Sequence, residues 1–160
     1  MGGYQLLRKR QLGQSQLYAR ELGLGAMSPK TKDDAVMIIR SAIIIGINFI
    51  DTADLYGFGE NESWIGEALR HDREHVILAT KVGNRWEEGN SGWTWDPSKE
   101  YIKNAVKRSL KRLNTDYIDL YQLHGGTIDD PIEETIGAFE ELKKEGVIRY
   151  YGLSSIRPNV

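Results

Sequence analysis

Four residues of different chemical types stand at or just beyond the ends of short apolar runs in this 160-residue sequence. They are an acid, a phenol, an amine and an imidazole: Asp51, Tyr56, Lys81 and His124. An ammonium group beside a phenol favours the phenolate, and a carboxylate beside the ammonium keeps that group charged. An imidazole can orient or polarise the same substrate oxygen. Side chains of these types could therefore protonate a carbonyl oxygen.

The same residues also have a structural interpretation. Asp51 and Lys81 could form a buried ion pair with Tyr56 packed over it, and such pairs occur without any catalytic role. Both interpretations stay open for this pair alone. The gathering of four such residues at the ends of apolar runs favours the chemical one.

The elements that must position these residues follow an alternating pattern. Short apolar or β-branched runs are followed by longer stretches of helical periodicity, which is typical of a parallel α/β sheet. The expected strands are 21–25, 48–51, 76–81, 117–124 and 147–154, and the expected helices are 33–45, 60–70, 97–113 and 131–145. Functional sites form at the carboxyl ends of parallel strands in open sheets and in barrels. Periodicity alone does not choose between those two architectures.

Proline residues mark the expected starts of two helices. Asp96 and Asp130 each precede a proline, and an acid at the N-cap before a proline at the first helical position is a common start signal. The acidic loop 127–130 has an alternative interpretation as a site for a hard cation. We interpret it as a helix start and expect no metal.

The ends of the sequence carry two further signals. Residues 4–20 alternate weakly around Gly13 and Gln14, which predicts a short hairpin ahead of the sheet. Pro158 is expected to open another helix.

Composition excludes several classes of protein. The formal net charge of -2 argues against nucleic acid as a partner, since phosphate binding needs a basic surplus. With no cysteine, disulfides and a thiol nucleophile are excluded. The apolar run 42–50 is broken by Gly46 and Asn48, and it is far shorter than the roughly 18 residues of a membrane span. We expect a cytoplasmic protein with no membrane association.

Several well-known nucleotide-binding and metal-binding motifs are incomplete or absent in this sequence. Residues 23–28 nearly match the dinucleotide fingerprint, but Ser28 stands where the third glycine belongs. No tyrosine is followed by lysine four residues later, and no phosphate-loop or His-Glu-x-x-His motif occurs. An open Rossmann or flavodoxin-like sheet fits the length of the chain, but it does not fit the residues at the strand ends.

Several stretches resemble one enzyme family, in the right order along essentially the whole chain. The sequence is similar to that of the aldo-keto reductases at 46–57, 61–62, 65–66, 79–81, 113–124 and 146–154. The resemblance implies a (β/α)8 barrel that reduces aldehydes or ketones, usually with NADPH and alternatively with NADH. It also implies that Tyr56 is the general acid, that Lys81 and Asp51 tune its acidity, and that His124 orients the substrate carbonyl.

The resemblance also implies cofactor contacts. Those we assign are Gly25, Ala26, Met27, Asp51, Ser154 and Ser155. Ser154 matches the family serine near the nicotinamide amide. The family commonly has asparagine at the next position, where this chain has Ser155. That residue keeps a hydroxyl but lacks the amide that would hold the carboxamide.

The length departs from the family pattern. A complete barrel takes roughly 250 residues, whereas residues 1–160 account for about five βα units and a hairpin. We therefore expect an incomplete barrel, a truncated form with impaired cofactor binding. Five parallel strands cannot close, so we expect self-association or a missing C-terminal half to cover the open sheet.

Three tryptophans, Trp86, Trp93 and Trp95, lie in a long loop after Lys81. One interpretation is an aromatic wall of the substrate pocket, which would favour apolar or aromatic carbonyl compounds. The other is that the rings pack over the mouth of the barrel. Trp86 is nearest the strand end and is our candidate for the pocket.

A second class of function, a non-enzymatic regulatory role, is the alternative. The same fold resembles the β-subunits of potassium channels, which bind cofactor and act as regulatory partners. The presence of all four catalytic residue types favours an enzyme.

Overall fold

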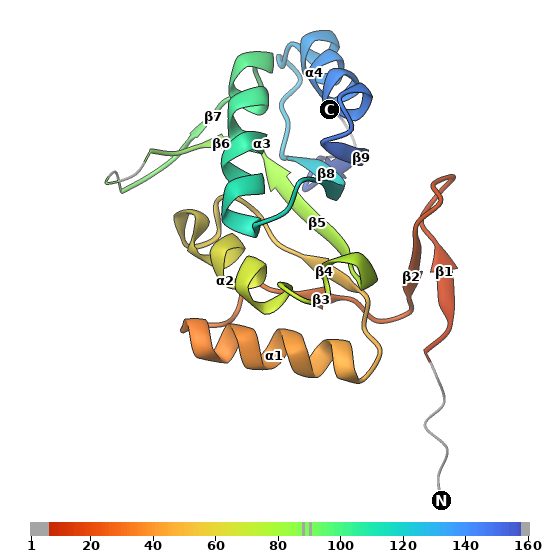
Figure 1. The fold of residues 1–160 in the computed structure, drawn as a ribbon. Coiled ribbons are helices and arrows are strands. Elements are labelled where there is room, and N and C mark those ends of the chain that lie inside the picture. Colours follow the sequence, from red (N-terminus) through yellow and green to blue (C-terminus); the bar gives the residue numbers. More distant parts are fainter. Residues whose placement is uncertain (1–6, 88, 90, 158–160) are drawn as a thin grey trace, which may run out of the picture.

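The computed structural model describes residues 7–87, 89 and 91–157, and a sheet of five parallel strands lies at its centre (Figure 1). The strands are β3 (Leu24–Gly25), β4 (Phe49–Asp51), β5 (Ile77–Val82), β8 (Ile118–His124) and β9 (Ile148–Ser154). Their spatial order follows the sequence, so each strand pairs with the next along the chain. Doubly wound sheets reverse direction at a switch point. The sheet therefore corresponds to part of a (β/α)8 barrel, and the open Rossmann or flavodoxin alternative is wrong.

In the part of the chain that the structure describes, four α-helices connect and flank these strands (Figure 1). They are α1 (Lys32–Ile44), α2 (Glu60–Ala68), α3 (Lys99–Leu113) and α4 (Ile132–Lys144), with 3-10 turns η1 (Tyr56–Gly59) and η2 (Arg73–His75). All four expected helices are present, with ends shifted by at most two residues. Within the described ranges, no helix is long and apolar enough to cross a membrane.

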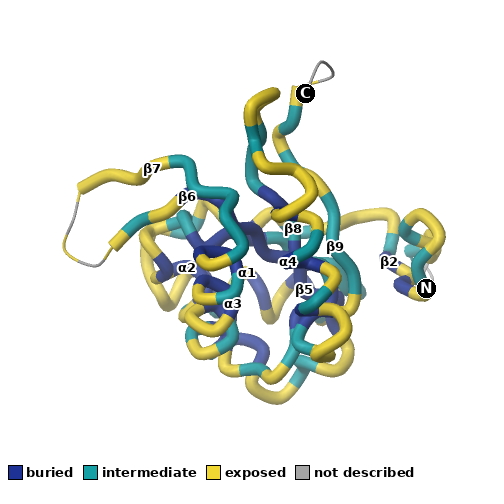
Figure 2. The backbone as a smooth tube through the Cα atoms, turned by 90° about the horizontal axis from the view of Figure 1, so that it is seen from above, coloured by how far each residue is buried: buried dark blue, intermediate teal, exposed yellow. Residues whose placement is uncertain are grey.

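The alternation of side chains along each strand separates a core face from a site face. Ile50, Leu78 and Tyr121 are fully buried in the cluster under the helices. Successive side chains on a strand point to opposite faces. On β4, Asp51 directly follows Ile50, and on β5 Lys81 lies three positions after Leu78. His124 likewise lies three positions after Tyr121 on β8. These odd separations place all three site residues on the opposite face from the core residues. Figure 2 shows the buried residues concentrated in the middle of the molecule.

The N-terminal hairpin is confirmed within the described residues. Strands β1 (Lys9–Gln11) and β2 (Tyr18–Arg20) pair antiparallel. Apolar residues of the hairpin pack with Ile77, near the start of β5, and form a second cluster with Phe49 and Tyr150. The part of the expected hairpin before residue 7 lies outside the described residues, as does Pro158.

The predicted helix starts need correction. The N-cap of α3 is Ser98, whose hydroxyl accepts a hydrogen bond from the amide of Tyr101. The carboxylate of Asp96 instead accepts from the amide of Ser98. At α4 the capping position is Pro131, and Asp130 accepts from the amide of Thr127. Both acids are therefore used by the loops that precede the helices.

Part of the long segment after β5 has regular structure that the sequence did not predict. It forms an antiparallel ribbon of β6 (Asn84–Arg85) and β7 (Thr94–Trp95), which extends away from the sheet (Figures 1 and 2). Strands of two residues are too short to show a periodic pattern, so the sequence indicated only a loop.

Candidate active site

An ion pair between β4 and β5 forms the centre of the site. The Nζ atom of Lys81 lies 2.6 Å from Oδ2 of Asp51 and donates a second hydrogen bond of 2.7 Å to the carbonyl oxygen of Thr52. Lys81 is only 5% exposed. A buried ammonium is costly unless it is paired, and these two acceptors compensate for the burial of Lys81.

Two rings lie next to this ion pair. The turn η1 follows β4 and places the ring centroid of Tyr56 5.2 Å from Nζ of Lys81. The ring of His124, at the end of β8, meets the Tyr56 ring edge to face at 5.9 Å. The structure therefore brings together all four residues singled out from the sequence. Their catalytic roles stay a prediction.

His124 has an environment that favours its neutral form. Burial lowers the pKa of its imidazole below the usual value, and the nearby ammonium of Lys81 lowers it further, while Asp51 opposes the shift. The Nδ1 atom is buried and has no hydrogen-bond partner within the described part of the chain. The environment therefore favours the neutral imidazole at pH 7.

This environment predicts how stability depends on pH. As the pH falls, the imidazole of the unfolded chain binds its proton near pH 6.5, whereas the imidazole of the folded chain binds it only at a lower pH. The free energy of unfolding therefore decreases as the pH falls below about 6.5. We expect His124→Gln to weaken that decrease and His71→Gln, in an exposed turn, to leave it unchanged. Urea unfolding at pH 5 and pH 7 measures the difference. A His124 imidazole that titrates above its ordinary value by NMR would contradict the prediction.

The predicted cofactor residues at the end of β3 lie beside Asp51. Gly25 is the register partner of Asp51, and the amide of Ala26 donates 2.8 Å to the carbonyl oxygen of Asp51. A Cβ added at Gly25 would meet no atom within 4 Å. Ala26 is buried, whereas Met27 is 64% exposed. The backbone at Gly25 is therefore accessible to a ligand that lies across the strand ends.

The other predicted cofactor residues lie on the far side of His124. Ser154 is the register partner of His124 on β9. Ser155 is exposed and has a left-handed backbone with φ of 62°. Asparagine adopts this conformation more readily than serine. The strand ends thus present backbone groups on the β3 side of the ion pair and serine hydroxyls on the β9 side, polar groups that fit the nicotinamide end of a dinucleotide.

Of the tryptophans, Trp95 covers the ends of β5 and β8. A Cβ added at Gly83 would lie 2.6 Å from its ring, and one added at Gly125 would lie 3.1 Å away. Its Nε1 atom donates 2.8 Å to Asp130. The contacts of Trp86 are with Phe58, Gly59 and Arg112. A role for Trp86 in the substrate pocket stays a prediction, since among the described residues its ring contacts none of the four central side chains.

A buried polar network beside the site was missed by the sequence reasoning. Glu62 is fully buried and accepts hydrogen bonds of 2.6 Å from Thr80 and 2.8 Å from Arg112. Asp54 is 1% exposed, and burial, followed by the charge of Glu62, raises the pKa of its carboxyl well above the usual value. The network adjoins the Lys81 strand through Thr80.

Asn61 ties this region to the end of β3. It accepts a 2.6 Å hydrogen bond from the hydroxyl of Thr52 and donates one of 2.6 Å to the carbonyl oxygen of Ala26. A signal was available in the sequence, because Asn61 lies four residues before Ile65 and therefore on the buried face of α2.

These observations define an α/β protein of the barrel type with an acid, an amine, a phenol and an imidazole gathered at the carboxyl ends of its parallel strands. A family model described as the aldo/keto reductase family matches residues 21–160. The chain belongs to this family.

Individual relatives agree with this assignment. The chain is 65% identical over 155 residues to the uncharacterized oxidoreductase YqkF of Bacillus subtilis (strain 168), covering 96% of this chain and 51% of the relative. It resembles the holo form of aldo-keto reductase AKR11C1 from Bacillus halodurans at 65% identity and a TM-score of 0.94, covering 96% of this chain and 52% of that one.

A more distant structure was solved with a nucleotide. An aldo/keto reductase from Klebsiella pneumoniae, in complex with NADP and acetate, is 34% identical with a TM-score of 0.77, covering 90% of this chain and 48% of that one. This chain thus spans about half the length of the relatives it matches.

Proposed function

We propose that this chain carries the catalytic centre for reduction of aldehydes or ketones to alcohols by a nicotinamide cofactor, with NADPH preferred. The observation that carries the proposal is the pair of the buried Lys81 and the partly exposed Asp51, with the rings of Tyr56 and His124 beside it. Family membership supports the same chemistry.

Each of the four side chains has a separate task in this proposal. Tyr56 gives its hydroxyl proton to the carbonyl oxygen, and the ammonium of Lys81 stabilises the phenolate that remains. Asp51 and the carbonyl oxygen of Thr52 hold that ammonium in place. The neutral imidazole of His124 donates a hydrogen bond that orients the carbonyl. The cofactor, when bound, supplies the hydride.

The residues that would hold the cofactor belong to the ion pair itself or lie on either side of it. They are Gly25, Ala26, Met27, Asp51, Ser154 and Ser155. The Klebsiella relative in complex with NADP supports a phosphorylated dinucleotide, and NADH is the alternative. The substrate is a small carbonyl compound. The expected cytoplasmic location stays a prediction that cell fractionation would test.

A titration of the chain with NADPH tests the proposal, with quenching of tryptophan fluorescence as the signal. We expect saturable but impaired binding, with a dissociation constant between about 1 µM and 1 mM, or about -8 to -4 kcal/mol. A parallel titration with NADH measures the preference. A chain that is folded by circular dichroism and shows no quenching with either nucleotide would contradict the proposal.

We further propose that the two open edges of the sheet are covered in the working protein. Leu153 on β9 and Ile132 and Ile136 on α4 are exposed near one edge, and Met37 and Ile44 on α1 are exposed near the other. A second copy could cover these residues, as could βα units like those of the relatives beyond the matched half. Light scattering tests this, because a stable monomer of the mass of this chain would argue against a second copy.

A further inference from the structure

The segment directly after Tyr56 has an unusual backbone. Gly57, Phe58 and Gly59 have φ angles of 58°, 49° and 90°, so three consecutive residues are left-handed. A residue with a Cβ rarely adopts this conformation because its side chain crowds the backbone. Such a conformation persists when surrounding contacts hold it. The position of the Tyr56 ring therefore depends on whatever packs against this turn.

Two side chains from distant parts of the sequence pack against the turn. A Cβ added at Gly59 would lie 2.7 Å from Cδ of Arg112 and 3.1 Å from Cη2 of Trp86. The rings of Phe58 and Trp86 meet edge to face at 5.7 Å. The guanidinium of Arg112 lies 5.3 Å from the Trp86 ring centroid. We call Trp86 and Arg112 the clamp.

The clamp is itself fixed by the protein interior. Arg112 reaches Oε2 of the fully buried Glu62 through Nε at 2.8 Å and Nη2 at 2.6 Å. The other carboxylate oxygen of Glu62 accepts from Thr80 at 2.6 Å, one residue before Lys81. One connected set of contacts thus joins the turn after Tyr56 to the strand that carries Lys81.

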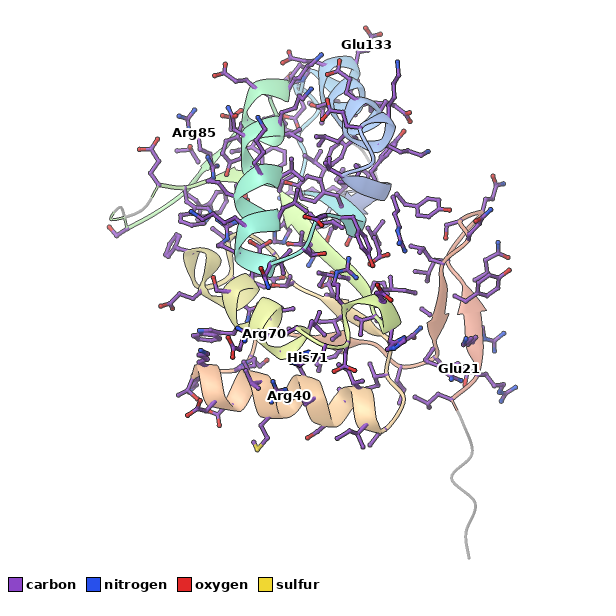
Figure 3. All side chains as sticks on the ribbon, in the orientation of Figure 1. Glu21, Arg40, Arg70, His71, Arg85 and Glu133 are labelled. Atoms are coloured by element: carbon purple, nitrogen blue, oxygen red, sulfur yellow. The ribbon has the colours of Figure 1, made fainter. Side chains whose placement is uncertain are left out.

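The ribbon brings Trp86 to this place. Arg85, at the end of β6, lies beside α3 (Figure 3), with its guanidinium 6.0 Å from the ring of Tyr101. Trp86 follows directly and is held between the turn and Arg112.

We propose that Trp86 and Arg112 are positioning residues, which hold the Tyr56 turn so that its hydroxyl faces the substrate carbonyl. This inference rests on the proposed function of Tyr56. It gives Trp86 a role in the rate of proton transfer, in place of a role as a wall that contacts the substrate.

Hydrogen exchange of the chain tests the inference without need of turnover. We expect amide exchange in the peptide covering residues 56–59 to be at least about tenfold faster in Trp86→Ala, because the local opening costs less. Trp86→Phe keeps an aromatic ring against Phe58 and is expected to restore slow exchange. Trp93→Ala, which removes a half-exposed ring from the same segment, is the matched control and is expected to exchange like the wild type.

A second variant separates local release from general unfolding. Phe58→Ala removes the partner ring from a residue that is 44% exposed, and we expect it to speed exchange at the turn while residues 118–124 stay protected. If Trp86→Ala unfolds the whole chain, Phe58→Ala decides the question. Unchanged exchange at the turn in the variants that fold would overturn the inference.

Kinetics distinguish the positioning role from a substrate wall. With an aromatic aldehyde, Trp86→Ala is expected to lower kcat with little change in KM. A raised KM with unchanged kcat and unchanged exchange would overturn the inference. Failure of the proposed function would instead appear as a wild-type chain that lacks turnover, with the exchange difference still present.

Discussion

Replacing Tyr56 by phenylalanine is expected to lower the rate of carbonyl reduction by about 10²–10⁴-fold, the usual contribution of a positioned general acid. The variant keeps the ring that meets His124 and Lys81 and removes only the hydroxyl. We therefore expect unchanged stability and unchanged NADPH binding. The measurement is NADPH oxidation with an aromatic aldehyde.

The matched control is Tyr18→Phe, which removes the same hydroxyl from a half-exposed tyrosine of the N-terminal hairpin. It is expected to turn over like the wild type. Wild-type turnover by Tyr56→Phe would show that the proton comes from another group. Loss of NADPH binding in the same variant would place the Tyr56 hydroxyl in the cofactor site.

The largest loss of stability is expected from Asp119→Ala. The carboxylate of Asp119 is almost fully buried and contacts Arg73 at 2.9 Å and Arg149 at 2.8 Å, and it also accepts from the amide of Leu78 at 3.0 Å. The two guanidinium groups each lie 4.1 Å from the ring centroid of Tyr117. Removing the acid leaves the mostly buried Arg73 without its counter-ion, which costs about 3–5 kcal/mol.

Urea unfolding measures this loss, and the comparison variant is Glu145→Ala. Glu145 also contacts a cation, with 2.9 Å to Lys103, but its side chain is half exposed. Exposed ion pairs contribute little, so stability is expected to stay near that of the wild type. Equal losses of stability in the two variants would show that burial does not determine how much Asp119 contributes to the free energy of unfolding.

The arrangement of strands and the meeting of the site residues could be predicted from the sequence. Apolar runs alternate with helical periodicity, and this determines parallel strands whose carboxyl ends lie together. Asp51, Lys81 and His124 follow from that arrangement, because each stands at or near the end of such a run. Tyr56 was singled out because it lies five residues beyond the end of the second run, but its exact placement depends on the short turn after β4, which periodicity does not predict.

Features that depend on tertiary packing could not be predicted. Glu62 and Arg112 are far apart in the sequence, and their pairing depends on how α2 packs against α3. The ring over the strand ends belongs to Trp95, since the ribbon turns the nearer Trp86 toward Phe58. The helix starts were misplaced because Asp96 has a local alternative to capping, the amide of Ser98.

The order of the strands determines how the sheet can form while the chain is being translated. Leu24 pairs with Ile50, and Ile118 pairs with Ile148, so each pairing joins consecutive βα units. Domains begin to fold from the N-terminus during synthesis. Each new strand therefore finds its partner already outside the ribosome, and the sheet can grow at one edge in the order of translation.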